Sequence, residues 1–272
     1  MFHFLHTFHP DPVLFAFHGI TVYWYGFFIV TGIVLALVTA VKLASYYGIN
    51  KDTIIDLSFW MILAGIAGAR LYHIFLEIPY YLQYPEQIIK LWQGGLAIHG
   101  ALIAGLAVLY IFSRKKGLNF WLLASILAPA AAIAQTVGRW GNYFNQELFG
   151  KPTSLPWGIP IDVMHRPAEF ISFSHFHPAF LYESLGNLFI FFILLGIHVY
   201  LFKKKRIRTY YYFSLTLLYL ILYSLLRFGT EFIRIDDTPV WFGIRFPQLL
   251  SGIIVITGII LLIVPNIKKA GK

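Results

Sequence analysis

The sequence contains no cysteine and little charge. The absence of cysteine from its 272 residues excludes a disulfide framework, a cysteine metal site and a cysteine nucleophile of its own. Charged residues make up 12% of the chain, about half of the roughly 25% in an ordinary soluble domain. With 58% hydrophobic residues and a mean hydropathy of +0.71, a soluble fold would leave too much apolar surface in water, so lipid is the expected solvent.

Two further absences bear on the organisation of the chain. Residues 1–18 hold no Lys or Arg, so they lack the charged start of a cleavable signal peptide, and the first long apolar segment is expected to remain as a span. No polar linker, low-complexity stretch or repeat divides the sequence. We therefore expect a single transmembrane domain over 1–272.

Long continuous apolar runs are abundant instead. A hydrocarbon core of about 30 Å needs roughly 20 apolar residues in a helix, and runs that do not alternate exclude membrane strands. The predicted fold class is all-α, a polytopic membrane protein with about seven transmembrane helices. The expected spans are about 19–41, 54–76, 96–113, 118–138, 179–202, 210–230 and 245–265, with ends defined to within a few residues.

The basic residues predict an orientation, because Lys and Arg in short loops stay cytoplasmic. With the N-terminus outside and the C-terminus cytoplasmic, 13 of the 21 Lys and Arg fall inside and six outside. This orientation makes 139–178 an outward-facing extramembrane segment. It also accounts for the net charge of +9 without a nucleic-acid partner, because the basic runs lie at the ends of apolar segments. The inner basic residues are Lys42, Lys51, Arg114, Lys115, Lys116, Lys203, Lys204, Lys205, Arg206, Arg208, Lys268, Lys269 and Lys272.

Polar residues from five separate segments gather near the expected outer ends of the spans. Their coincidence at one depth favours a functional site over unrelated structural roles. They are Tyr25, His99, Arg139, Asn142, Asn145, Glu147, Gly150, His177, Tyr182, Glu183, Tyr223, Arg227, Glu231 and Arg234.

Four of these residues share one face of the sixth expected helix, because steps of four, four and three separate Tyr223, Arg227, Glu231 and Arg234. An ionisable residue in a span costs several kcal/mol unless it is paired or lies in a wet cavity. Arg227 therefore needs a partner; Glu231, one turn away, can supply part of the pairing and a phosphate group could supply the rest. A purely structural ion pair is the alternative.

Taken singly, the other residues have structural alternatives. A lone His99 in an apolar helix is commonly a hydrogen-bonded structural residue. Asn142 suits a turn, and Tyr25 suits the aromatic belt at a membrane surface. His175 and His177 have no acidic or cysteine partner spaced to complete a tetrahedral set, so we expect no metal. Zinc-protease, P-loop, serine-hydrolase and dinucleotide motifs are also missing from the sequence.

The run GRWGNYFNQELFG at Gly138–Gly150 closely resembles the signature of the bacterial prolipoprotein diacylglyceryl transferases. The resemblance covers nearly the whole chain, and six ordered motifs are specific together. The other five are Trp24-Tyr25-Gly26, Gly68-Ala69-Arg70, Gly94 to Gly100 with His99, His177-Pro178 with Leu181-Tyr182-Glu183, and Tyr223 to Arg234.

The resemblance implies a transferase of lipoprotein biosynthesis in the bacterial cell membrane. Such an enzyme moves the diacylglyceryl group of phosphatidylglycerol to the thiol of the lipobox cysteine of a prelipoprotein. The products are a thioether and glycerol-1-phosphate, and this protein lipidation is the first step of bacterial lipoprotein maturation. A thiolate attacks an sp³ carbon and a phosphate monoester leaves, so no cofactor is expected.

This chemistry assigns three catalytic residues. A thiol with a pKa near 8.5 needs a base near neutrality, and His99 is the candidate; an orienting or headgroup-binding role is its alternative. The planar guanidinium groups of Arg139 and Arg227 suit the phosphate.

The remaining assignments concern substrate binding. We expect Asn142 and Glu147 to organise the signature segment and the headgroup contacts. Glu231 and Tyr223 are expected to hold Arg227. The other residues expected at the substrate site are Tyr25, Gly150, His177 and Glu183.

Two other classes of membrane protein compete with this interpretation. A transporter or channel would line a path across the bilayer with polar residues, whereas the inner halves of these spans carry few. Another phospholipid headgroup transferase would use the same phosphate chemistry with a different acceptor.

Overall fold

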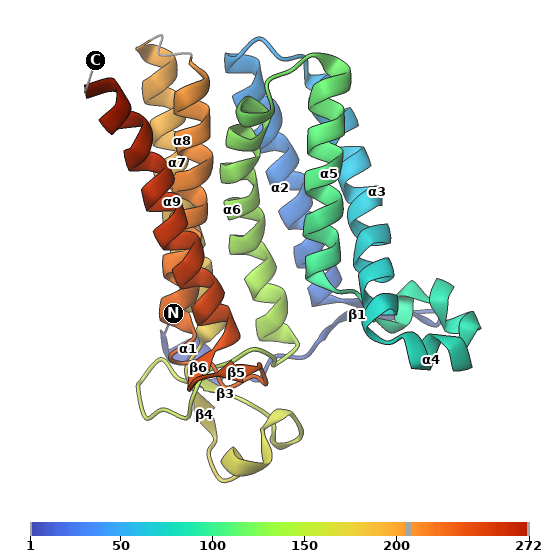
Figure 1. Cartoon of the computed structure of the whole chain (residues 1–272). Helices are drawn as coiled ribbons and strands as arrows, with labels where there is room; N and C mark the ends of the chain where they lie inside the picture. The colour runs from blue at the N-terminus through green and yellow to red at the C-terminus, as the bar shows by residue number, and fades with distance from the viewer. Residues whose placement is uncertain (1, 205–207, 271–272) are drawn as a thin grey trace. The chain divides into compact units, whose positions relative to one another are not determined.

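The computed structural model describes residues 2–204 and 208–270, and the side chains of residues 4–204 and 208–263. Seven helices in this part of the chain are long and apolar enough to cross a membrane (Figure 1). They confirm the predicted polytopic all-α class. They are α2 (Trp24–Tyr46), α3 (Lys51–Leu76), α5 (Ile98–Lys116), α6 (Phe120–Phe144), α7 (Ala179–Lys203), α8 (Thr209–Thr230) and α9 (Phe246–Ala270).

Part of the charge pattern that predicts the orientation lies outside the described residues. Lys205, Arg206 and Lys272 belong there, as do the side chains of Lys268 and Lys269. The orientation of the termini stays a prediction.

The fold contains two compact units. One comprises 1–39 with 127–272, and the other comprises 40–126. The expectation of a single domain stays a prediction.

In the unit 40–126, the helices α3 and α5 pack against each other through glycine. A Cβ atom on Gly68 would lie 2.6 Å from the carbonyl oxygen of Gly100, so the two backbones approach as closely as small residues allow. The Asn50 side chain accepts a hydrogen bond from the backbone N–H of Asp52 at 3.0 Å and caps the start of α3. Gly117, with φ +66°, ends α5 in the left-handed conformation.

The segment between α3 and α5 is short and only partly helical. It contains α4 (Ile78–Gln83) and the 3-10 helices η1 (Pro85–Ile89) and η2 (Leu91–Gln93). Arg70, buried in the last turns of α3, holds this segment through carbonyl oxygens. Its Nε lies 3.0 Å from the oxygen of Ile88 and its Nη1 lies 2.7 Å from that of Gly94 and 2.9 Å from that of Gly95. Arg70 therefore ties the segment to the helix end.

In the other unit, α6, α7 and α8 share a hydrophobic core. Ala132, Leu194 and Leu215 are buried in this cluster, and they come from the three helices in turn. Helix α9 packs on α8. At Gly186 of α7, a Cβ atom would lie 2.6 Å from the Cδ2 of Leu226, so the glycine lets α7 and α8 approach.

The helix ends differ from the predicted span ends by up to six residues. Helix α6 runs to Phe144 and not to 138, so the first residues of the segment predicted as extramembrane, 139–178, are helical. The first span begins at Trp24 and not at 19, because the preceding residues form a hairpin of β1 (Val13–Phe17) and β2 (Ile20–Tyr23). His18 and Gly19 take positive φ at its turn, as a tight hairpin requires.

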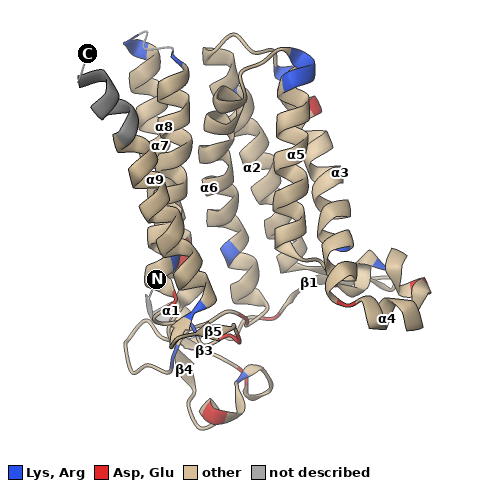
Figure 2. Ribbon diagram, viewed as in Figure 1, with Lys and Arg blue, Asp and Glu red and all other residues tan. Residues whose placement is uncertain are grey.

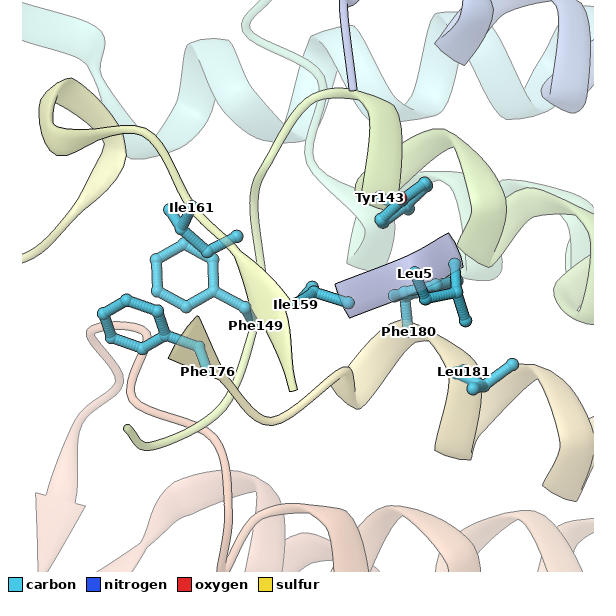
Figure 3. Packing of buried hydrophobic residues seen from close by; sticks show 8 residues of the cluster. All are labelled: Leu5, Tyr143, Phe149, Ile159, Ile161, Phe176, Phe180 and Leu181. Carbon is cyan, nitrogen blue, oxygen red and sulfur yellow. The ribbon is translucent and has the colours of Figure 1, made fainter. Parts of the chain in front are cut away.

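The residues after α6 fold into a small layer of short strands and 3-10 turns, and its extramembrane position stays a prediction. Strand β3 (Ile159–Pro160) pairs antiparallel with β4 (His175–Phe176), with the 3-10 turns η3 (Val163–His165) and η4 (Ala168–Phe170) between them. Figure 3 shows its buried cluster, to which α1 (Phe2–Thr7) contributes Leu5. The Tyr143 and Phe180 rings stack at 4.6 Å, so the core of this layer continues into the ends of α6 and α7.

A polar network also joins this layer to the N-terminal segment. The Gln146 amide nitrogen donates to Asp162 Oδ2 at 2.6 Å and to the Pro10 carbonyl at 3.1 Å. The hydrogen bond from Gln146 lowers the pKa of Asp162, and the nearby His9 adds to this effect against an opposing contribution from burial. Asp162 therefore stays ionised at neutral pH.

Candidate active site

Glu183, in the first turns of α7, is the centre of an arginine cluster. Its Oε2 lies 2.5 Å from Arg139 Nε, and its Oε1 lies 3.1 Å from Arg227 Nη1 and 3.0 Å from Arg234 Nη1. Arg139 comes from α6, Arg227 from α8 and Arg234 from the turn after α8. One carboxylate on α7 thus connects α6 with the end of α8 and the turn that follows it.

Glu231 forms a second centre one turn beyond Arg227. Its Oε1 pairs with Arg227 Nη2 and lies 3.8 Å from Arg234 Nε, and its Oε2 lies 2.6 Å from Arg245 Nε. Arg234 Nε also lies 2.7 Å from Asp236 Oδ1. Burial disfavours the charged form of Asp236, but the guanidinium groups of Arg234 and Arg245 outweigh it and hold the pKa of Asp236 below its usual range.

Burial separates Glu183 and Glu231 from two arginines of the cluster. The side chains of Glu183 and Glu231 are 4% and 0% exposed, whereas those of Arg139 and Arg227 are each 19% exposed. Buried carboxylates require compensation by paired charge, and the arginines provide it. The accessible groups of the cluster are therefore Arg139, Arg227 and Arg245 together with Asp236, which is 23% exposed, so its exposed side keeps a net positive charge.

The cluster lies at one end of the helices of its unit. The basic residues Lys203, Lys204 and Arg208 lie at the opposite ends of α7 and α8 (Figure 2). Arg139 and Arg227 are thus set apart from the basic residues that predict the orientation.

The last turn of α6 adds polar groups beside Arg139. The Asn142 Oδ1 lies 3.5 Å from Arg139 Nη1, and the Asn142 amide nitrogen donates to Glu147 Oε1 at 2.7 Å. The Tyr25 ring packs on this turn, because a Cβ atom on Gly141 would lie 2.9 Å from its Cδ2. Tyr25, Asn142 and Glu147 therefore line the same end of α6 as Arg139.

His177 and Gly150 lie in the layer of short strands and turns that follows α6. The Gly150 backbone N–H donates to the His177 carbonyl at 2.9 Å, and a Cβ atom on Gly150 would lie 2.8 Å from that of His177. The His177 Nδ1 lies 3.1 Å from the Tyr182 hydroxyl. Burial, with a smaller contribution from Lys151, lowers the pKa of His177, so its imidazole is neutral at neutral pH.

Two further predicted site residues make other contacts. His99 lies in the other compact unit, in the first turn of α5, where its exposed ring is 5.9 Å from that of Tyr72. Tyr223 stacks on Tyr219 with ring centres 6.1 Å apart, and no hydrogen bond among the described residues joins it to Arg227. Arg227 is held by two carboxylates, those of Glu231 and Glu183.

Arg245 and Asp236 complete the cluster, and neither is among the site residues predicted from the sequence. Sequence spacing offers no signal for Arg245, which lies 14 residues from Glu231. Sequence spacing places Arg234 on the helical face of Arg227, but it does not predict its contact with Glu183, 51 residues away.

The comparisons with known proteins agree with the family predicted from the motifs. The family model for prolipoprotein diacylglyceryl transferase matches residues 12–264. Three curated relatives carry the name phosphatidylglycerol–prolipoprotein diacylglyceryl transferase. The protein from Synechocystis sp. is 42% identical over 92% of this chain and 87% of its own length. The protein from Finegoldia magna is 41% identical over 92% and 94%, and that from Nostoc sp. is 39% identical over 93% and 87%. The chain belongs to the prolipoprotein diacylglyceryl transferase family.

Proposed function

We propose that this chain transfers the diacylglyceryl group of phosphatidylglycerol to the thiol of a lipobox cysteine in a prelipoprotein. The products are a thioether and glycerol-1-phosphate. Family membership and the names of the relatives support the reaction. The seven apolar helices support a multi-pass membrane enzyme, and we place it in the bacterial cell membrane with the N-terminus outside.

One observation carries the proposal: Arg139 and Arg227 are held by the same carboxylate and stay partly exposed. Arg139 uses Nε on Glu183 and Nη1 near Asn142, and Arg227 uses Nη1 and Nη2 on two carboxylates. Among the described residues, Arg139 Nη2 and Arg227 Nε make no hydrogen bond or ion pair. Two fixed guanidinium groups with N–H groups to spare suit a phosphate diester, whose oxygens accept bidentate hydrogen bonds.

In the proposed step, the cysteine sulfur attacks the carbon of the diacylated glycerol that is bonded to the phosphate oxygen. The S–C bond forms as the C–O bond breaks, the electron pair stays on the phosphate oxygen, and the thiol proton passes to a base. Arg139 and Arg227 stabilise the charge that grows on the leaving phosphate, which is electrostatic stabilisation by groups oriented in advance. His99 stays the candidate base, because its imidazole chemistry suits a thiol.

The groups around Arg139 suit the polar headgroup. Asn142 and Glu147 offer an amide and a carboxylate to the glycerol hydroxyls, and Tyr25 offers a phenol beside them. We assign Gly150 and His177 to the shape of this region, because the close contact between their chain segments leaves no room for a larger residue at position 150. Glu183 and Glu231 orient the two arginines.

The test uses the full chain in lipid bilayers with phosphatidylglycerol labelled in its acyl chains. A lipobox peptide and its Cys→Ser counterpart serve as acceptors. Label on the Cys peptide alone, with glycerol phosphate released, supports the proposal. Consumption of phosphatidylglycerol without peptide labelling would indicate another headgroup transferase, and intact phosphatidylglycerol with a folded protein would indicate a transporter or channel.

A further inference from the structure

Arg245 is held in place by a hairpin that joins α8 to α9. Strand β5 (Val240–Trp241) pairs antiparallel with β6 (Ile244–Arg245). Phe242 and Gly243 take positive φ at its tight turn. The Phe246 backbone N–H donates to the Pro239 carbonyl at 2.8 Å, and α9 begins at that residue. Arg245 is therefore fixed at a junction between a closed turn and a spanning helix.

The Arg245 side chain points into the arginine cluster. Its Nε lies 2.6 Å from Glu231 Oε2, and its Nη2 donates to the Asp236 carbonyl at 2.8 Å and lies 3.6 Å from Asp236 Oδ1. Glu231 is fully buried and holds Arg227 through its other oxygen. Arg227 and Arg245 thus pair with different oxygens of the same carboxylate.

The charge count of the cluster depends on Arg245. The ion pairs among the described residues join four arginines (139, 227, 234 and 245) to three carboxylates (183, 231 and 236). Counted over these ion pairs alone, the cluster has one excess positive charge, which matches the single negative charge of a phosphate diester. Glu147, which bonds to Asn142 beside Arg139, lies outside this count. Without Arg245 the count is zero, and Glu231 is left to Arg227 and the more distant Arg234.

We propose that Arg245 is a positioning residue that keeps the charge of Arg227 available to the phosphate. By compensating Glu231 from its second oxygen, it prevents that buried carboxylate from neutralising Arg227 completely. This inference rests on the proposed function, because it assigns a role within the same phosphate site. A merely structural role, in which Arg245 only anchors the hairpin, would depend on its contacts and not on the charge count.

The experiment separates charge from contact with four variants. Arg245→Gln lowers the count to zero, and the double variant Arg245→Gln with Asp236→Asn restores it to plus one without restoring the Arg245 contacts. Arg245→Lys keeps the charge and loses the planar fork. Arg208→Gln, an exposed change at the far end of α8, is the matched control. KM for phosphatidylglycerol and kcat are measured separately for each variant, with thermal unfolding as the check on folding.

We expect Arg245→Gln to raise KM for phosphatidylglycerol roughly tenfold, the effect of one charge a short distance from the ligand in a partly buried site. The double variant and Arg245→Lys should recover most of that loss, and the control should match the wild type. If Arg245→Gln does not fold, the double variant and Arg245→Lys still decide between charge and contact.

Two results would overturn the inference by itself. One is a folded Arg245→Gln variant with wild-type KM. The other is a folded double variant whose KM for phosphatidylglycerol is no lower than that of Arg245→Gln. If Arg245→Gln does not fold, the overturning result is a double-variant KM at least tenfold above the wild-type value. Absence of transfer by the wild-type chain would instead refute the proposed function, on which the inference depends.

Discussion

Replacement of Arg227 by Lys tests the phosphate clamp most directly. Arg227 reaches two carboxylates through two nitrogens, with Nη1 at 3.1 Å from Glu183 Oε1 and Nη2 on Glu231. A lysine ammonium keeps the charge but places its donors on one atom, so it does not span both acids and face a phosphate. A hydrogen bond to a charged group contributes about 1.5–3 kcal/mol. Loss of two such bonds predicts a fall in kcat/KM on the order of 10²- to 10⁴-fold.

The assay measures initial rates of label transfer to the lipobox peptide at several phosphatidylglycerol contents. Because catalysis requires stronger contacts in the transition state than in the ground state, most of the fall should appear in kcat. Arg208→Lys, the same exchange at the exposed start of α8, is the control and should keep wild-type kinetics.

Wild-type-like turnover by a folded Arg227→Lys variant would refute the reasoning. The positive charge alone would then suffice at this position, and the planar arrangement between two carboxylates would have no catalytic meaning.

The remaining predictions concern stability and pH. Glu183→Gln leaves three guanidinium groups around a neutral side chain, so we expect a loss of about 3–5 kcal/mol of stability and nearly all activity, measured by thermal unfolding and transfer rate. Gly141→Ala should destabilise by about 1–3 kcal/mol, because its methyl group would press on the Tyr25 ring. Gly138→Ala, which meets only ordinary van der Waals contact inside the same helix, should not lower the unfolding temperature. Asp162 has a lowered pKa, so its contribution to stability is present above the unfolded value of 3.8 and is lost as the pH falls through the folded pKa. Thermal unfolding followed from about pH 6 to pH 3 should show the loss below about pH 4, and an Asp162→Asn variant should lack that component.

Composition and local spacing determine the spans, one ion pair and the family of this protein without any knowledge of tertiary contacts. The seven spans follow from hydropathy, because each apolar run must satisfy its backbone hydrogen bonds internally in lipid. The Arg227–Glu231 pair follows from a step of four on a helix, and the ion pair is present. The family follows from six ordered motifs and is confirmed by the comparisons.

Local reasoning failed where polar residues continue an element. Arg139 and Asn142 lie in the last turns of α6, yet hydropathy places the end of the helix before them. Their polar groups contact protein partners, so the helix continues without exposing unpaired charge to lipid. Hydropathy does not predict the hairpin at 13–23 either, because its apolar residues resemble the start of a span.

Only the tertiary structure decided which residue organises the arginines. Glu183 lies 44 residues from Arg227 and 51 from Arg234, and nothing in the spacing distinguishes it from the other acids. The packing of α7 on α8, which the small residue Gly186 permits, brings these charges together. Sequence spacing predicts contacts along one helix because its geometry is fixed, whereas contacts between helices depend on how complete side-chain surfaces fit.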